Sequence, residues 1–144
     1  MYNKDLTPWD VRANFDRQTF MRALGATLEV VEAGRVEIGV SFSEGLCQQN
    51  GFLHAGVLTS VADSACGYAA LTMAPPDHDV LAVEFKINLL RPASAPRFVA
   101  RARVLRAGRT LTVCTAEVFG ITPSGEELVA TMLSTVIVRP IRGA

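Results

Sequence analysis

The sequence lacks an excess of charge of either sign. Its 14 Lys and Arg residues balance its 14 Asp and Glu residues, and both kinds are dispersed along the chain. A protein that binds duplex nucleic acid or an anionic membrane surface concentrates positive charge in one region. We therefore expect neither nucleic acid nor a membrane as a partner, whereas a small anionic ligand needs only two or three local arginines.

Cysteine is scarce and irregularly spaced. Cys47, Cys66 and Cys114 are odd in number and form no CxxC pair. This pattern argues against both a disulfide framework and a zinc site, so we expect no bound metal. Reduced thiols are typical of the cytoplasm, and the start MYNKDLTPWD lacks the basic residues and apolar run of a secretion signal. The sequence thus predicts a cytoplasmic protein.

Apolar residues are abundant, at 49% of 144, which is enough for one domain with a sizeable core over residues 1–144. The dominant stretch is residues 54–74, HAGVLTSVADSACGYAALTMA. It is long enough for a buried helix, but its many Ala, Gly and Ser residues require other elements to wrap closely around it. Asp63 is its only charged residue, and a carboxylate in such a setting carries a desolvation cost. Asp63 is therefore the first candidate for chemistry.

Spacing and turn residues predict the remaining elements. An amphipathic helix starts at Thr7-Pro8 and ends at Gly25, and a polar loop covers residues 43–53. The predicted strands are residues 26–32, 35–42, 80–90, 98–105, 110–121 and 127–138, with short connections rich in Gly and Pro. This order predicts an α+β fold in which a curved antiparallel sheet wraps around the long helix. One sheet face and one helix cannot bury all the apolar surface, so we expect a homodimer or a dimer of dimers.

The start of the long helix is a second candidate region. The first N–H groups of a helix, here those of Ala55 and Gly56, point outward without intrahelical partners and favour negative charge, such as that on a carbonyl oxygen under attack. His54 precedes them and is expected to position the loop rather than act as a base. His54 and Asp63 are nine residues apart, about 13.5 Å along a helix. If both act on one bond, the site must be shared between two antiparallel chains.

At this point the sequence resembles a known family, the hotdog-fold acyl-CoA thioesterases of the phenylacetic-acid-degradation type. The resemblance runs from about Gly25 onwards and is strongest in GFLHAGVLTSVADSA at 51–65, INLLRPA at 87–93 and RAGRT at 106–110. It implies a hotdog fold around the long helix. It also implies hydrolysis of an acyl-CoA to a free acid and CoA, with no cofactor because CoA is part of the substrate.

The resemblance also implies roles for individual residues. Asp63 corresponds to the nucleophile or general base, and the Ala55 N–H corresponds to the donor that polarises the thioester carbonyl, with the acid coming from the partner subunit. The expected catalytic set is completed by His54, Gly56 and Gln48. The segments RPA and RAGRT border the nucleotide end of the ligand, so the expected substrate-binding residues are Asn50, Gly51, Arg91, Arg106, Gly108 and Arg109. Asn50 and Gly51 could instead simply form a turn.

The sequence departs from the family pattern in three places. Gln48 stands where the family commonly has Asn, and Ala55-Gly56 stands where it has Gly-Gly. Ala still supplies a backbone N–H, so the role of the donor survives the change. Some relatives place a hydroxyl residue near position 82 to orient water, but this chain has Ala82 there.

Two other functions use the same expected pocket. A hotdog hydratase or dehydratase would act on the acyl chain rather than on the thioester, although the motif of those enzymes is not found here. A non-catalytic acyl-CoA binding or sensing module would bind the ligand without turnover. Release of thiol from the substrate distinguishes hydrolysis from both.

Overall fold

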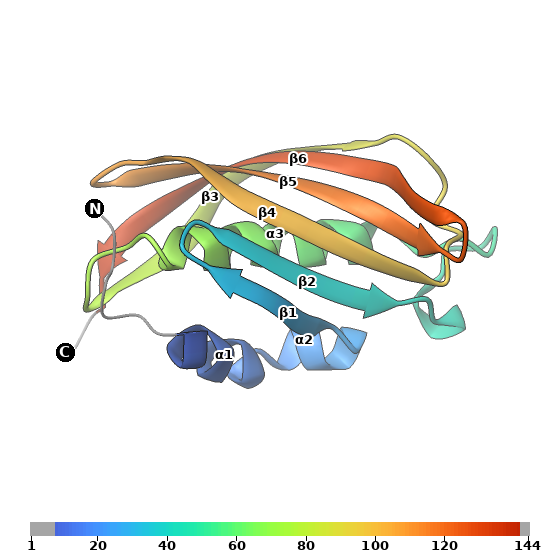
Figure 1. Ribbon diagram of the computed structural model, residues 1–144, viewed down its shortest axis with the longest axis horizontal. Helices are drawn as coiled ribbons and strands as arrows, with labels where there is room; N and C mark the ends of the chain where they lie inside the picture. The colour runs from blue at the N-terminus through green and yellow to red at the C-terminus, as the bar shows by residue number, and fades with distance from the viewer. Residues whose placement is uncertain (1–7, 142–144) are drawn as a thin grey trace.

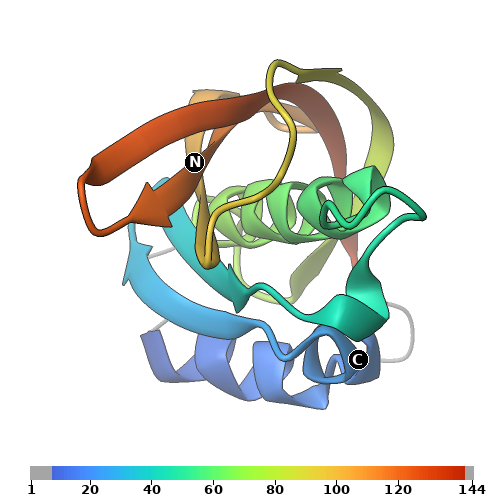
Figure 2. The same cartoon turned by 90° about the vertical axis from the view of Figure 1, so that its right-hand side faces the viewer.

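The structure is a computed structural model that describes residues 8–141. It confirms the α+β fold: one antiparallel sheet curves around a long central helix (Figures 1 and 2). The helices are α1 (Pro8–Arg17), α2 (Thr19–Leu24), α3 (Ala55–Leu71) and the short 3-10 helix η1 (Glu44–Leu46). The strands are β1 (Thr27–Glu32), β2 (Arg35–Ser41), β3 (His78–Leu89), β4 (Arg97–Ala107), β5 (Leu111–Thr122) and β6 (Gly125–Pro140).

The six strands lie in the order β1-β2-β4-β5-β6-β3, and all neighbours are antiparallel. All six predicted strands are therefore confirmed, and β6 extends beyond its predicted range at both ends. The strand β3 lies at one edge of the sheet, so its outer backbone pairs with no other strand within residues 8–141. In its pairing with β6, Val80 lies opposite Val138 and Leu89 lies opposite Ala130. The two ends of β3 therefore lie at opposite ends of the sheet.

The core lies between the concave face of the sheet and α3. Small side chains such as Ala62 and Ala65 are fully buried on the sheet side of the helix, which lets the strands approach closely. Cys66 and Cys114 are also fully buried, and burial raises the pKa of both thiols, that of Cys114 to about 12. Both therefore stay protonated and act as packing groups.

The N-terminal helix differs from the prediction of one continuous helix. It is broken at Gln18, whose backbone is extended (φ −78°, ψ 96°), and it continues as α2 until Gly25 ends it in a left-handed conformation. The Gln18 side chain does not cap α2; it forms hydrogen bonds to Ser64 and Tyr68 of α3. The expected cap at Thr7 lies outside the described residues.

The central helix α3 begins as predicted and ends earlier, at Leu71 rather than at residue 74. Thr72 explains the early end, because its hydroxyl donates to the Ala69 carbonyl and accepts from the Gly34 N–H in the β1–β2 turn. None of the helices within residues 8–141 is long and apolar enough to cross a membrane.

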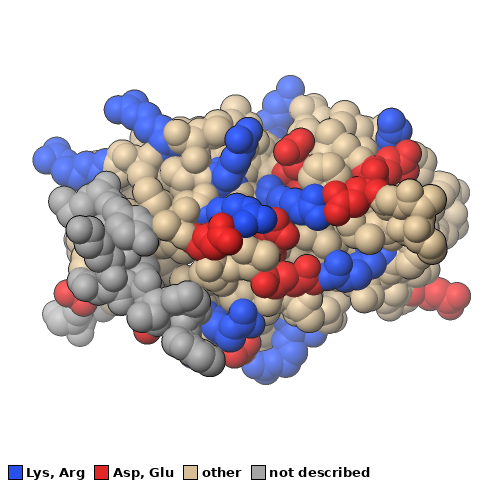
Figure 3. Space-filling model, in the orientation of Figure 1, with Lys and Arg blue, Asp and Glu red and all other residues tan. Residues whose placement is uncertain are grey.

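Charged side chains alternate in sign over the face shown in Figure 3. Arg101 donates to both carboxylate oxygens of Glu126 at 2.7 and 2.6 Å, and Arg35 donates to Glu32 and Glu37 at 2.9 and 2.6 Å. Each of these cations therefore has an acidic neighbour. The expectation that no nucleic acid binds stays a prediction.

Candidate active site

The first turn of α3 has one open backbone donor. The Gly56 N–H donates to Nδ1 of His54 at 2.8 Å, and the Val57 N–H donates to the His54 carbonyl at 2.9 Å. Within residues 8–141 the Ala55 N–H has no acceptor. His54 is thus the cap of α3, as its expected positioning role requires. Gly56 can serve as a second donor only if the His54 ring turns away, so that role stays a prediction.

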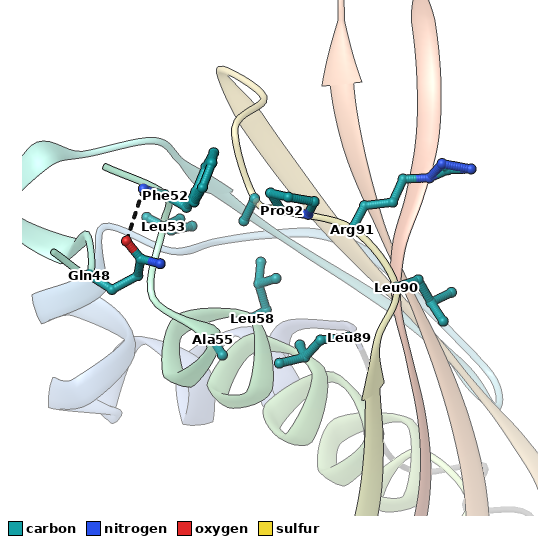
Figure 4. A pocket seen from close by; sticks show the side chains of 10 residues that line it. Gln48, Phe52, Leu53, Ala55, Leu58, Leu89, Leu90, Arg91 and Pro92 are labelled. Atoms are coloured by element: carbon teal, nitrogen blue, oxygen red, sulfur yellow. Dashed lines mark hydrogen bonds between the residues drawn. The ribbon is translucent and has the colours of Figure 1, made fainter. Parts of the chain in front are cut away.

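The loop before α3 is held by Gln48. Its carboxamide oxygen accepts from the Asn50 N–H at 2.5 Å and from the Phe52 N–H at 3.4 Å, and the backbone N–H of Gln48 donates to the Phe52 carbonyl at 2.9 Å. In Figure 4 the Gln48 amide nitrogen points toward the pocket described below. Because its oxygen closes the loop, the part of the Gln48 side chain that remains available on the pocket side is a hydrogen-bond donor.

Asn50 and Gly51 form the tip of this loop. Both are exposed, and Gly51 has a φ of 82°, a left-handed conformation that glycine adopts without strain. Neither residue is among those that line the pocket. The geometry accounts for both as turn residues, and their expected contact with substrate stays a prediction.

A pocket of about 380 Å³ opens beside the start of α3 (Figure 4). Its walls come from two segments far apart in the sequence: the loop with the first turn of α3, and the end of β3 with the stretch that follows it. The lining residues are Gln48, Phe52, Leu53, Ala55, Leu58, Leu89, Leu90, Arg91, Pro92 and Ala93. Most of this lining is apolar, so the pocket suits an apolar group whose polar end reaches the Ala55 N–H. The motif pointed to Ala55, whereas the wall at Leu89 and Leu90 was recognisable only as an apolar strand end.

Asp63 lies eight residues beyond Ala55, about 12 Å along the helix axis. It is half-buried and does not line the pocket. No hydrogen bond or ion pair of its carboxylate to another residue in 8–141 is found, and burial raises its pKa above the ordinary aspartate value. The chain therefore keeps an unpartnered carboxylate on the accessible side of α3, but one subunit does not bring it to the open N–H.

The four expected ligand groups at the nucleotide end divide between opposite ends of the sheet. Arg91 lines the rim of the pocket and donates to Glu127 at 3.2 Å. Arg106, Gly108 and Arg109 lie at the β4–β5 turn, which is joined to the other end of β6 because the Val138 N–H donates to the Thr110 carbonyl. The intervening nine residues of β3 correspond to about 30 Å.

Gly108 has a structural reason to be glycine. Its N–H donates to the Leu111 carbonyl at 2.9 Å, and a Cβ at position 108 would collide with that same oxygen. The close approach of backbone to backbone in this turn therefore accounts for the residue. Its expected proximity to a ligand stays a prediction.

Comparison with known proteins now adds to this geometry. A sequence profile of the thioesterase superfamily matches residues 50–124, which is more than half of the chain and includes the end of the loop, α3 and the β4–β5 turn. The chain belongs to the thioesterase superfamily. A crystal structure of a thioesterase family protein from Silicibacter pomeroyi superposes with a TM-score of 0.89 at 45% identity, covering 91% of this chain and 96% of that chain.

Two relatives of this chain are named as enzymes that hydrolyse esters or thioesters. A Saccharolobus solfataricus protein provisionally named an esterase is 32% identical over 117 residues, which cover 78% of this chain and 77% of the relative. The 1,4-dihydroxy-2-naphthoyl-CoA hydrolase of Listeria monocytogenes is 27% identical over 119 residues, which cover 83% and 94%. The hotdog fold is thereby confirmed, and the protein is a hydrolase of the thioesterase class.

Proposed function

We propose that this thioesterase hydrolyses an acyl-CoA to a free acid and CoA at a site shared by two subunits. The thioester carbonyl would accept a hydrogen bond from the Ala55 N–H of one subunit. Asp63 of the partner subunit would either attack the carbonyl carbon or take a proton from a water molecule that attacks it. The proposal is carried by two features of the same helix. The Ala55 N–H is open beside an apolar pocket, and the half-buried Asp63 carboxylate has no partner within residues 8–141.

The helix itself supports a shared site. Two antiparallel copies of α3 that cross at Thr59, midway between Ala55 and Asp63, would bring each carboxylate to the other chain's N–H. The accessible side of α3 suits such a crossing because its residues are small. The hydroxyls of Thr59 and Ser60 donate to the carbonyls of Ala55 and Gly56 at 2.8 and 2.6 Å, so they already have partners when a second chain covers them.

The free edge of β3 supports the same dimer. Leu81, Val83, Phe85 and Leu89 on this strand are 47%, 56%, 42% and 51% exposed. A second β3 paired antiparallel to the first would satisfy the free backbone groups and cover these side chains. That pairing would also bring the partner's β4–β5 turn to the same end of the extended sheet as Arg91. Arg91, Arg106 and Arg109 could then surround the phosphates of one CoA.

The chemistry has two balanced forms, and both require the Asp63 carboxylate to be ionised. In the first, a carboxylate oxygen attacks the carbonyl carbon, the C–S bond breaks, CoA leaves as a thiolate that takes up a proton, and water hydrolyses the resulting anhydride. In the second, Asp63 accepts a proton from a water molecule whose oxygen attacks the carbonyl carbon, the C–S bond then breaks, and the leaving CoA thiolate takes up the proton from Asp63. In each form the oxygen that becomes negative lies at the Ala55 N–H. Neither form requires a metal or a cofactor.

The apolar lining is suited to the acyl group. Leu53, Leu58 and Leu89 supply aliphatic surface, and Phe52 supplies an aromatic ring at the same pocket. The resemblance to the phenylacetate-degradation type favours an aryl acyl group, so aryl-CoA thioesters belong in the first substrate panel beside short and medium alkyl ones.

The deciding experiment measures thiol release from that panel by the unchanged protein and by Asp63→Asn. The proposal expects release from at least one thioester and a loss of kcat of about 10²-fold to 10⁴-fold in Asp63→Asn, the range for removal of a positioned base. Near-normal turnover by Asp63→Asn would remove this residue from the chemistry. Tight binding without release would favour an acyl-CoA sensing module, and hydration of an enoyl-CoA without thiol release would favour a hydratase.

A further inference from the structure

A chain of three hydrogen bonds links the break between α1 and α2 to the middle of α3. The Ser64 hydroxyl donates to Oε1 of Gln18 at 3.0 Å, and Nε2 of Gln18 donates to the Tyr68 hydroxyl at 3.0 Å. The Tyr68 hydroxyl donates in turn to Oδ1 of Asn14 at 3.0 Å. Every donor points in the same direction along this chain, an arrangement in which the bonds strengthen one another.

This series of hydrogen bonds is shielded from solvent at Tyr68. Tyr68 is only 6% exposed, and its ring meets the ring of Phe15 edge to face with centroids 5.9 Å apart. Burial raises the pKa of Tyr68, so the phenol stays protonated and remains the donor to Asn14. The Gln18 side chain forms hydrogen bonds to two positions of α3 that lie one helical turn apart, Ser64 and Tyr68. Two bonds at different heights on the helix oppose both rotation of this turn and its displacement along the helix axis.

We propose that Gln18 is a positioning residue that acts through Ser64 on the turn of α3 carrying Asp63. The proposal rests on the proposed function, because it assigns Gln18 to the placement of the reactive carboxylate. Asp63 directly precedes Ser64, and successive helical residues point about 100° apart, so an anchor on one flank leaves the carboxylate free on the accessible side. The carboxylate has no partner of its own within residues 8–141, so its position depends on the backbone that Gln18 holds.

This arrangement explains why the N-terminal helix is broken. A continuous helix would carry Gln18 in helical conformation, whereas the extended backbone at this residue lets its side chain meet α3. The Gln18 side chain does not cap α2, and its two hydrogen bonds both go to α3. Displacement of about 1 Å at a reactive group can lower the rate about 10²-fold, so even a small shift of this turn would affect turnover.

The test compares Gln18→Ala with Asn14→Ala in steady-state hydrolysis of the best acyl-CoA. Both variants remove a partner of Tyr68, but only Gln18→Ala releases Ser64. We expect kcat to fall about tenfold in Gln18→Ala with KM within about twofold, and kcat to stay within about twofold of the unchanged protein in Asn14→Ala. Equal losses of kcat in the two variants, or a Gln18→Ala variant that folds with an unchanged kcat, would overturn the proposal.

Ser64→Ala provides a second route to the same bond, and its small side chain preserves packing if Gln18→Ala folds poorly. Ser64→Ala should reproduce the loss of kcat, and the double variant should lose no more than either single variant, because all three lack the same hydrogen bond. Additive losses would contradict a shared mechanism.

Asp63→Asn is measured in parallel, so that failure of this proposal can be distinguished from failure of the proposed function. If Asp63→Asn loses activity and Gln18→Ala does not, only the positioning role fails; if the unchanged protein releases no thiol, both proposals fail.

Discussion

The Nδ1 atom of His54 accepts the N–H of Gly56 at 2.8 Å, and this bond leaves the neighbouring N–H of Ala55 as the open donor at the start of α3. The histidine is therefore used to organise the first turn of the helix. The same turn forms part of the wall of the apolar pocket. A carbonyl that enters the pocket meets a donor that needs no rearrangement of the protein, which is the condition under which such a donor stabilises a developing negative charge most strongly.

Replacement of Ala55 by proline should remove this donor without unfolding the helix. Ala55 is the first residue of α3, where proline is well tolerated, and His54 already has ψ of 138°, in the range that a following proline requires. We expect Ala55→Pro to retain its fold by circular dichroism and to lose about 10²-fold to 10³-fold in kcat, the usual effect of losing one oxyanion donor. Ala55→Val is the matched control, because it adds similar bulk to the pocket but keeps the N–H. An equal loss of kcat in both variants would assign the effect to bulk.

Subunit mixing tests whether the site is shared. In a hybrid dimer of one Asp63→Asn chain and one Ala55→Pro chain, one site receives both intact groups and the other receives neither. Random reassociation makes about half of the dimers hybrid, so the mixture should regain about one quarter of the unchanged activity for a two-fold symmetric dimer. The measurement is thiol release after the two inactive proteins are unfolded together and refolded. A mixture that stays inactive, while each variant refolded alone forms dimers, would place the whole site within one chain.

The acid side of the pH–rate profile should report Asp63. Burial raises its pKa, so the ionised form that the mechanism needs is lost on acidification at a higher pH than for an ordinary aspartate. We therefore expect kcat to fall with decreasing pH through a midpoint above the ordinary aspartate pKa. The measurement is kcat at saturating substrate between neutral pH and the acid limit of folding. A midpoint at or below the ordinary aspartate pKa would contradict a partly buried setting for the Asp63 carboxylate.

The raised pKa of Asp63 also makes the stability of the protein depend on pH. A carboxyl whose pKa is higher in the folded than in the unfolded state lowers the free energy of unfolding as pH rises from the unfolded to the folded pKa. Asp63→Asn has no such ionisation, so it should unfold at a higher temperature than the unchanged protein at neutral pH. The difference should vanish below the ordinary aspartate pKa, where Asp63 is neutral in both states. A variant less stable than the unchanged protein at neutral pH would indicate that the carboxylate makes a stabilising contact.

Much of the fold could be predicted because its signals are local. The alternation Val36, Ile38, Val40 predicted a strand with one buried face, and all three side chains are buried in β2. Gly25 ended the N-terminal helix where the sequence indicated, through a left-handed φ of 69°. The break at Gln18 could not be predicted, since the apolar spacing continues across it. At the break, the Gln18 side chain forms two hydrogen bonds to residues 46 and 50 positions further along the chain, and the sequence does not reveal such distant partners.

The sequence by itself determined the parts of the candidate site that one helix supplies: His54 before the first turn, the N–H of Ala55, and Asp63 too far along the axis to meet it. Helix geometry alone sets these relations. Only the tertiary structure decided that Leu89 and Leu90 form the wall opposite Ala55, and that Arg91 lies at the other end of the sheet from Arg106 and Arg109. Strand order and register bring together or separate segments that are distant in sequence, and no local pattern encodes that pairing.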